Sequence, residues 1–276
     1  MENIRQAVER ARAGKSPPGS RISETMSLPR RRIDVAPLDQ TAGPQINETE
    51  LNDAYLQSKR VVAYNGADQR TRPYDMLRTQ VLQSMNVSGW KILAVTSPTP
   101  GCGKTLTAIN LAFSIARQPD QSVLLVDFDL QKPQVANYLG LRPVDDGALA
   151  VLQERATLRS TNMLVRAGKQ RITVLPTIST RESSELIGSR AMRSLLQDIR
   201  RHYQSHTVIL DLPPILSSDD VISILPQVDC VLLVAAVGLS KASEVEECNR
   251  YLQSSHLLRL VVNKANEESA SYYCYY

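Results

Sequence analysis

The sequence contains no apolar segment long enough to cross a bilayer. Its longest apolar run, residues 230–239 (CVLLVAAVGL), is about half of the ~20 residues that a transmembrane helix needs. The amino end, MENIRQAVER, also lacks the apolar core of a signal segment. These two absences predict a cytoplasmic protein.

Cysteine is scarce, and a strong excess of charge of one sign is missing. The four cysteines show no metal-ligand spacing, so we expect reduced thiols at Cys102, Cys230, Cys248 and Cys274. The formal net charge of +4 is too small to indicate nucleic-acid binding. A local basic cluster, residues 30–32, is a candidate contact for a partner or an anionic membrane surface, although an inert solvated face explains it as well.

The composition divides the chain into three parts. Hydrophobic residues make up 42% of it and charged residues 22%, which excludes disorder of the whole chain. We expect residues 1–70 to form an amphipathic helix and a largely disordered linker, residues 71–265 a folded domain, and residues 266–276 a flexible tyrosine-rich tail. The helix is indicated by apolar residues at helical spacing, and the linker by a long stretch of proline, serine, threonine, glycine and charge.

Short apolar runs alternate with helical patterns in the predicted domain. The runs cover residues 91–97, 122–128, 172–177, 206–213, 229–237 and 257–263, and the helical patterns include residues 105–117 and 184–201. Most runs are apolar throughout, which is typical of strands covered on both faces. The alternation predicts an α/β fold with a mainly parallel central sheet and helices on both faces.

The first run leads into TSPTPGCGKTLT, a phosphate-binding turn at the start of a helix. Its glycines let backbone amides surround a phosphate, Lys104 reaches the outer phosphates, and the Thr105 hydroxyl can ligate magnesium. One departure is Pro98, which stands where the general motif has its first glycine. The expected nucleotide-binding residues of the turn are Pro100, Gly101, Cys102, Gly103, Lys104, Thr105 and Leu106. Cys102 is either filler in the turn or a low-pKa redox thiol.

Acidic residues follow two of the apolar runs. VLLVDFDLQKP carries Asp127 and Asp129, and VILDLPP carries Asp211. Because the carboxyl ends of parallel strands share one edge, these carboxylates are expected beside the phosphate turn. Three carboxylates next to a triphosphate indicate a bound Mg²⁺, held by Thr105, Asp129 and Asp211. Asp127 is the candidate proton acceptor, and Lys104 and Asp129 complete the catalytic set. The alternative is that single aspartates cap the helices that follow.

These motifs together resemble a known family. A TSPxPGxGKT turn, an LLVDxD(x)3P strand end, a VILDxPP strand end and a carboxyl-terminal tyrosine cluster are similar to those of the bacterial protein-tyrosine kinases that govern polysaccharide polymerisation and export, members of the P-loop NTPase superfamily. The resemblance covers about residues 74–263 and the tail. It implies a kinase domain over residues 71–265 that uses ATP and Mg²⁺, with Asn263 contacting adenine. It also implies autophosphorylation at Tyr272, Tyr273, Tyr275 and Tyr276.

The resemblance also implies partners. They are a membrane-spanning polysaccharide co-polymerase or activator that recruits the kinase to the inner face of the membrane, a tyrosine phosphatase, and further copies of the chain in a homo-oligomer. Two departures bear on these expectations. Gln131 stands where the family usually has arginine, although Lys132 is adjacent, and the oligomer-forming Glu-x-x-Arg-x-x-Arg pattern reads Arg72, Asp75 and Arg78 here.

Two other functions are compatible with the same motifs. One is an ATPase of the partition and cell-positioning type, although residues 98–100 lack the extra lysine that such proteins usually carry early in the turn. The other is a non-catalytic regulator that binds nucleotide. The tail tyrosines themselves could instead form an aromatic anchor for a partner.

Overall fold

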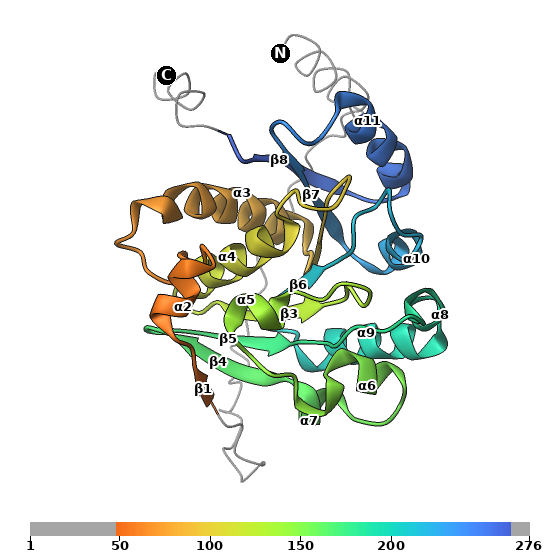
Figure 1. Ribbon diagram of the computed structural model, residues 1–276, viewed down its shortest axis with the longest axis horizontal. Helices are drawn as coiled ribbons and strands as arrows, with labels where there is room; N and C mark the ends of the chain where they lie inside the picture. The colour runs from red at the N-terminus through yellow and green to blue at the C-terminus, as the bar shows by residue number, and fades with distance from the viewer. Residues whose placement is uncertain (1–47, 266–276) are drawn as a thin grey trace, which may run out of the picture. The chain divides into compact units, whose positions relative to one another are not determined.

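An eight-stranded sheet forms the centre of the part of the chain that the computed structural model describes, residues 48–265 (Figure 1). Its strand order is β1-β4-β5-β3-β6-β2-β7-β8. The strands are β1 (Glu48–Glu50), β2 (Ile92–Thr96), β3 (Ser122–Asp127), β4 (Met163–Ala167), β5 (Gln170–Leu175), β6 (His206–Asp211), β7 (Cys230–Ala236) and β8 (Leu257–Asn263).

The sheet is parallel except for one pair. Strands β4 and β5 run antiparallel and form a hairpin, while every other neighbouring pair is parallel. Strands β2 and β7 are buried along their whole length, as expected for strands covered on both faces. The α/β fold with a mainly parallel sheet is therefore confirmed, whereas β1 and β4 were not predicted.

Helices cover both faces of the sheet. The helices are α2 (Asp53–Ser58), α3 (Arg72–Ser88), α4 (Lys104–Ala116), α5 (Val135–Leu139), α6 (Ala148–Leu152), α7 (Leu158–Thr161), α8 (Ser183–Ile187), α9 (Arg190–His202), α10 (Asp220–Ile224) and α11 (Ala242–Tyr251). Single 3₁₀ turns lie at Gln69–Thr71, Val144–Asp146, Leu225–Gln227 and Leu252–Ser254. None of the helices in the described part is long and apolar enough to span a membrane.

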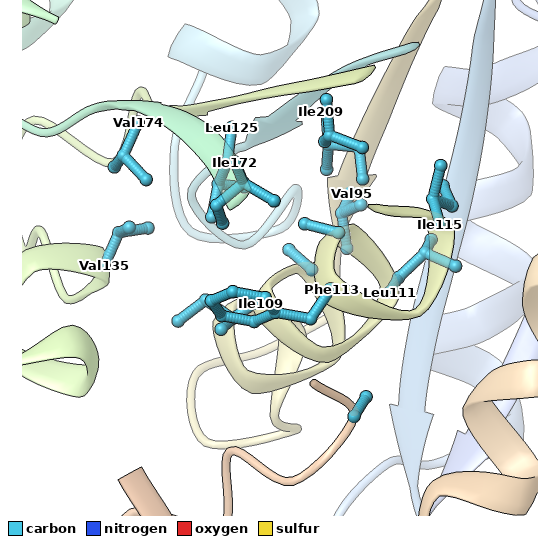
Figure 2. Packing of buried hydrophobic residues seen from close by; sticks show 14 of the residues in the cluster. Val95, Ile109, Leu111, Phe113, Ile115, Leu125, Val135, Ile172, Val174 and Ile209 are labelled. Atoms are coloured by element: carbon cyan, nitrogen blue, oxygen red, sulfur yellow. The ribbon is translucent and has the colours of Figure 1, made fainter. Parts of the chain in front are cut away.

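Two hydrophobic clusters fill the space between the sheet and the helices. The first cluster joins side chains of α2, α3, α4 and α5 to one face of the sheet, and the second joins α6, α9, α10 and α11 to the other face. Figure 2 shows the first cluster, in which Val95, Leu125 and Ile209 of three strands lie close to the side chains of α4. Helix α4 is buried on nearly all sides because α3 and α5 cover what the sheet does not.

The predicted helix over residues 184–201 is two helices. Helix α8 ends at Ile187, and α9 begins after Ser189, whose side chain accepts a hydrogen bond from the Met192 amide at 3.2 Å. A serine that caps a helix in this way satisfies an otherwise unpaired backbone donor. The break follows from Gly188-Ser189, which the periodic pattern alone did not reveal.

The folded part begins before residue 71, so the linker expected up to residue 70 is too long. Leu56, Val61 and Ala63 are completely buried in the first cluster. The buried side chain of Asn110 on α4 accepts hydrogen bonds from the amides of Val62 and Ala63 at 2.8 and 3.0 Å. This segment has little regular structure, so no periodicity marked it as folded. The expected amino-terminal helix and the tail tyrosines lie outside the described residues.

Candidate active site

The phosphate-binding turn joins the end of β2 to the start of α4. Gly101 and Gly103 have φ angles of 84° and 94°, a region that side chains with a Cβ rarely enter. Asn263, the last residue of β8, donates from its side-chain amide to the Cys102 carbonyl at 2.9 Å. A Cβ on Gly103 would collide with that amide. The conformation therefore favours glycine at position 103, and a larger residue would displace the Asn263 side chain.

Lys104 is the cation at the centre of the site. Its Nζ lies 2.8 Å from Asp129 Oδ2 and 3.6 Å from Asp211 Oδ1. The neighbouring hydroxyl of Thr105 donates to Asp211 Oδ2 at 2.6 Å. Burial opposes the charge on Lys104, but Asp211 and Asp129 outweigh this effect and raise the pKa of the lysine. The lysine therefore stays protonated and available to a phosphate.

Asp127 is held by backbone amides and is completely buried. Its Oδ1 accepts from the Asp129 amide at 3.2 Å, and its Oδ2 accepts from the amides of Gln134 and Val135 at 3.0 and 2.9 Å. Burial, followed by the negative charge of Asp211, raises the pKa of Asp127 to about 8. The two aspartates are direct neighbours in the β3–β6 register. Asp127 therefore holds a proton more tightly than an exposed aspartate, which makes its carboxylate the more basic one once it is ionised.

The donor set suits a hard divalent cation. Oδ1 of the buried Asp211 has no hydrogen-bond partner, and its other oxygen meets the Thr105 hydroxyl. Burial raises the pKa of Asp211, although Lys104 and the Thr105 hydroxyl act in the opposite direction, so a further cation would stabilise its charged form. Within residues 48–265, no three histidine, cysteine, aspartate or glutamate side chains are grouped closely enough to hold a metal by themselves. Hydroxyl and carboxylate oxygens nevertheless fit Mg²⁺, which usually completes its shell with phosphate and water oxygens.

The structure brings together all the site residues that the sequence predicts within the described part. Lys104, Thr105, Asp129 and Asp211 contact one another, and Asp127 contacts the Asp129 backbone. Pro100, Gly101, Cys102, Gly103 and Leu106 complete the turn and the first turn of α4, against which Asn263 lies. The phosphoacceptor candidates Tyr272, Tyr273, Tyr275 and Tyr276 lie outside the described residues.

Some contacts of the site were not predicted. The Ser240 hydroxyl lies 3.3 Å from Cys102 Sγ and accepts from the Ala236 amide, which links the loop after β7 to the phosphate turn. The amide of Lys132 donates to Asp129 Oδ1 at 3.0 Å, but its side chain is exposed and forms no ion pair among residues 48–265. A single serine far along the chain gives no sequence signal for such a contact.

Two charged positions of α3, Asp75 and Arg78, make contacts within the chain. Asp75 lies 3.0 Å from Arg78 and 2.9 Å from Arg117, and it accepts from the Ser114 hydroxyl at 2.6 Å. These contacts tie α3 to α4. In this chain the middle charge of the Arg72, Asp75, Arg78 pattern therefore serves an internal contact.

Known proteins share this domain. The family model of the CobQ/CobB/MinD/ParA nucleotide binding domain matches residues 93–272. A putative tyrosine-protein kinase, EpsB of Ralstonia nicotianae, is 30% identical over 82% of this chain. The matched region is only 29% of the length of EpsB. The tyrosine-protein kinase YwqD of Bacillus subtilis is 29% identical over 74% of this chain and 84% of its own.

A solved structure agrees with these relatives. The kinase domain of the Escherichia coli tyrosine kinase ETK is 31% identical, with a TM-score of 0.65 over 73% of this chain and 80% of that one. The expected resemblance to bacterial tyrosine kinases is thus confirmed at the level of sequence and fold. The family match covers well over half of the chain and includes every element that carries the site. The chain therefore belongs to the CobQ/CobB/MinD/ParA nucleotide-binding domain family, and its relatives are bacterial tyrosine-protein kinases.

Proposed function

We propose that the chain is an ATP-dependent protein-tyrosine autokinase that acts in polysaccharide polymerisation and export. The observation that carries this proposal is the contact of Lys104 and Thr105 with Asp129 and Asp211 at one edge of the sheet. It is the arrangement that phosphoryl transfer needs, because such catalysis depends on positioning and charge. The names of the relatives favour tyrosine as the acceptor.

Each site residue has a role in this proposal. Lys104 would exchange part of its contact with the aspartates for the outer phosphates of ATP. Thr105 and Asp211, with Asp129 next to them, would hold Mg²⁺, which supplies positive charge to the phosphate oxygens. Asn263 would contact the adenine, a role that rests on the resemblance to the kinase family alone.

The transfer itself needs a proton acceptor. The tyrosine oxygen forms a bond to the γ-phosphorus while the bond from that phosphorus to the β–γ bridging oxygen breaks, which leaves ADP. The hydroxyl proton of the tyrosine goes to the carboxylate of Asp127. A pKa of about 8 makes that carboxylate a stronger base than an ordinary aspartate.

The proposed acceptors are close in sequence to the nucleotide edge. Tyr272 lies nine residues beyond Asn263. An extended chain of that length spans roughly 30 Å. The tail therefore has the length to reach a catalytic edge, its own or that of a neighbouring copy. Phosphorylation of Tyr272, Tyr273, Tyr275 and Tyr276 would add about −6 to −8 charges. We propose that this charge expels the tail from an acidic site and loosens a homo-oligomer.

The decisive experiment is incubation of the purified chain with ATP and Mg²⁺. We expect phosphotyrosine on the tail, and we expect Lys104→Met to remove it, because the lysine supplies the charge that meets the outer phosphates. Mass spectrometry of the tail peptide and release of free phosphate are the two readouts. Free phosphate without phosphotyrosine would indicate a partition-type ATPase, and binding without either product a nucleotide-dependent regulator.

A matched variant separates the acceptor from the catalyst. Phenylalanine at all four tail tyrosines should abolish most phosphotyrosine while nucleotide affinity stays at the wild-type value. Undiminished phosphotyrosine in that variant would refute the tail as acceptor.

The partners follow from the same proposal. A membrane-spanning activator would recruit the kinase to the inner face of the membrane, and a tyrosine phosphatase would reset the tail. Co-purification with an activator before and after removal of residues 1–47 tests whether that segment takes part in recruitment.

A further inference from the structure

Cys102 stands between two glycines in the phosphate turn. Gly101 and Gly103 have left-handed φ angles of 84° and 94°, and glycine leaves the backbone free to adopt other conformations as well. The turn has to keep one conformation if its amides are to surround a phosphate. Because a glycine offers no side chain to pack, Cys102 is the residue through which the rest of the fold can hold this part of the turn.

The side chain of Cys102 is completely buried and contacts the loop between β7 and α11. Its Sγ lies 3.3 Å from the hydroxyl oxygen of Ser240 in that loop and 3.7 Å from that of Thr99. Leu239 of the same loop borders the turn as well, since its Cδ2 lies 3.5 Å from the position that a Cβ on Gly101 would take. The loop therefore contacts two consecutive residues of the phosphate turn.

Ser240 is itself fixed to the sheet. Its hydroxyl oxygen accepts from the Ala236 amide at 3.0 Å, and its own amide donates to the Ala236 carbonyl at 2.9 Å. Ala236 is the last residue of β7, a strand that is buried along its whole length. The hydroxyl oxygen accepts one hydrogen bond and keeps its own proton, which it can donate to the Cys102 sulfur. These contacts form a continuous path from the central sheet through Ser240 to Cys102.

A second strand holds Cys102 by its backbone. Asn263 at the end of β8 donates to the Cys102 carbonyl at 2.9 Å, and β8 is the neighbour of β7 in the sheet (Figure 1). The Val237 amide donates to the Asn263 carbonyl at 2.9 Å, so the loop after β7 is also joined to the end of β8. Asn263 thus holds the main chain of the turn, whereas Ser240 holds its side chain. Loss of the Ser240 hydroxyl removes the second of these contacts and leaves the first.

We infer that Ser240 is a positioning residue, which acts through Cys102 to hold the phosphate turn in the conformation that binds a triphosphate. The inference rests on the proposed function in one respect, namely that this turn binds ATP, and it does not depend on transfer to tyrosine. In this role Ser240 does not contact the nucleotide. Its removal should therefore weaken every ligand that carries the phosphates, with or without a base.

The test measures the affinity of the full chain for ATP and for inorganic tripolyphosphate, both with Mg²⁺, by titration calorimetry. Ser240→Ala should weaken both ligands by the same factor, about three- to tenfold, which corresponds to the loss of one neutral hydrogen bond. Ser240→Thr keeps the hydroxyl and should bind both ligands nearly as the wild type does. Weaker binding of ATP with unchanged binding of tripolyphosphate would indicate a contact with the base or the sugar and would overturn the inference. Wild-type affinity for both ligands in Ser240→Ala would also overturn it.

A double-mutant cycle tests whether Ser240 acts through Cys102. In a Cys102→Ala background, Ser240→Ala should cause no further loss of ATP affinity, because the effects of two residues on one path do not add. A full additional loss would overturn the inference. The matched control is Ser255→Ala, since the hydroxyl of this buried serine has no hydrogen-bond partner in the part of the chain that the structure describes. A loss of affinity in Ser255→Ala as large as that in Ser240→Ala would indicate a general effect on the fold and would also overturn the inference.

A measurement without ligand separates this inference from the proposed function. Backbone ¹⁵N order parameters of residues 101–103 in the chain without nucleotide should fall in Ser240→Ala and keep their wild-type values in Ser255→Ala, because only the first variant frees the side chain of Cys102. A wild-type chain that binds no ATP would contradict the proposed function, but these order parameters would still decide whether Ser240 holds the turn. Unchanged order parameters in Ser240→Ala would overturn the inference.

Discussion

The side-chain amide of Asn263 lies close to Gly103 in the phosphate turn, so these two residues can be tested together. Gly103→Ala should weaken nucleotide binding, because alanine at a φ of 94° is strained by about 1–2 kcal/mol and its Cβ collides with the Asn263 amide. The double variant Gly103→Ala/Asn263→Ala should recover part of the loss, since it removes the collision but keeps the strain. Nucleotide affinity, measured by titration calorimetry, distinguishes the two variants.

A control for the backbone strain alone exists in the same chain. Gly89 follows α3 with a φ of 69°, and no atom lies within 4 Å of a Cβ built on it. Gly89→Ala should therefore lower the melting temperature without changing nucleotide affinity. If Gly103→Ala and Gly89→Ala bind nucleotide with equal affinity, the close approach of Asn263 to Gly103 does not contribute to nucleotide binding.

The sequence predicted the site residues that belong to motifs and missed those that depend on loop geometry. Lys104, Thr105 and Asp211 follow from a strand, a turn and the shared edge of a parallel sheet, all of which are local or topological signals. The contact of Ser240 with Cys102 has no such signal. It depends on how the loop after β7 packs against the phosphate turn.

At the scale of elements, Asp229 joins β2, β7 and α9. Its Oδ2 accepts from the amides of Lys91 and Ile92, both at 2.8 Å, and its Oδ1 accepts from Arg200 at 2.9 Å. Burial opposes ionisation of this carboxyl, but the hydrogen bonds from Arg200 and from the two amides outweigh burial and lower its pKa. A carboxylate with a lowered pKa stabilises the fold above its unfolded pKa, and this contribution is lost as the pH falls through the folded pKa.

Asp229→Asn should therefore destabilise the protein most at neutral pH. We expect a loss of about 1–3 kcal/mol in the free energy of unfolding at pH 7, because hydrogen bonds to a charged acceptor are replaced by weaker ones. The difference from the wild type should shrink as the pH falls below about 4, where the unfolded carboxyl is protonated. Urea unfolding across this pH range measures it, with Glu246→Gln as a surface control. A pH-independent difference would contradict the assigned role of the charge.

The elements that the sequence predicted are those with strong, uniform apolar runs. Strand β7 coincides closely with the run at residues 229–237, whereas β5 begins two residues before the predicted 172–177. Strand β4 was missed because it is short and only partly buried, and Arg166 interrupts its apolar run. The antiparallel β4–β5 hairpin also departs from strict alternation of strands and helices, so that rule did not anticipate it.

At the scale of the whole described part, the sheet order explains why distant segments share one site. Strands β3, β6, β2 and β7 are consecutive neighbours in the sheet. The carboxyl ends of β3 and β6 and the turn that follows β2 therefore bring Asp127, Asp211 and Lys104 to one edge. The fold class could be predicted because alternation of buried strands and helices leaves few other topologies. The extent of the domain could not, since residues 48–71 fold by contacts with α4 and β4 that lack any periodic signal.

Residues 48–71 should be essential for stable folding of the domain. A chain that begins at residue 72 should fail to fold stably, because it loses Leu51, Leu56, Val61 and Tyr64 from the first hydrophobic cluster. Each large apolar side chain that leaves the core costs about 1.5–3 kcal/mol, so the summed loss is comparable to the whole stability of a typical domain. Asn110 would also lose the partners of its buried side chain.

The comparison is with a chain that begins at residue 46, which keeps every contact of the described segment. It should melt at the same temperature as the full chain, while the shorter chain should aggregate or melt far lower. Asn110→Leu in the full chain tests the hydrogen bonds of this segment separately from its apolar contacts. The substitution leaves the amides of Val62 and Ala63 without their acceptor, so the free energy of unfolding should fall by about 1–3 kcal/mol. Equal melting temperatures for the two truncated chains would mean that residues 48–71 only rest on the domain and do not stabilise it.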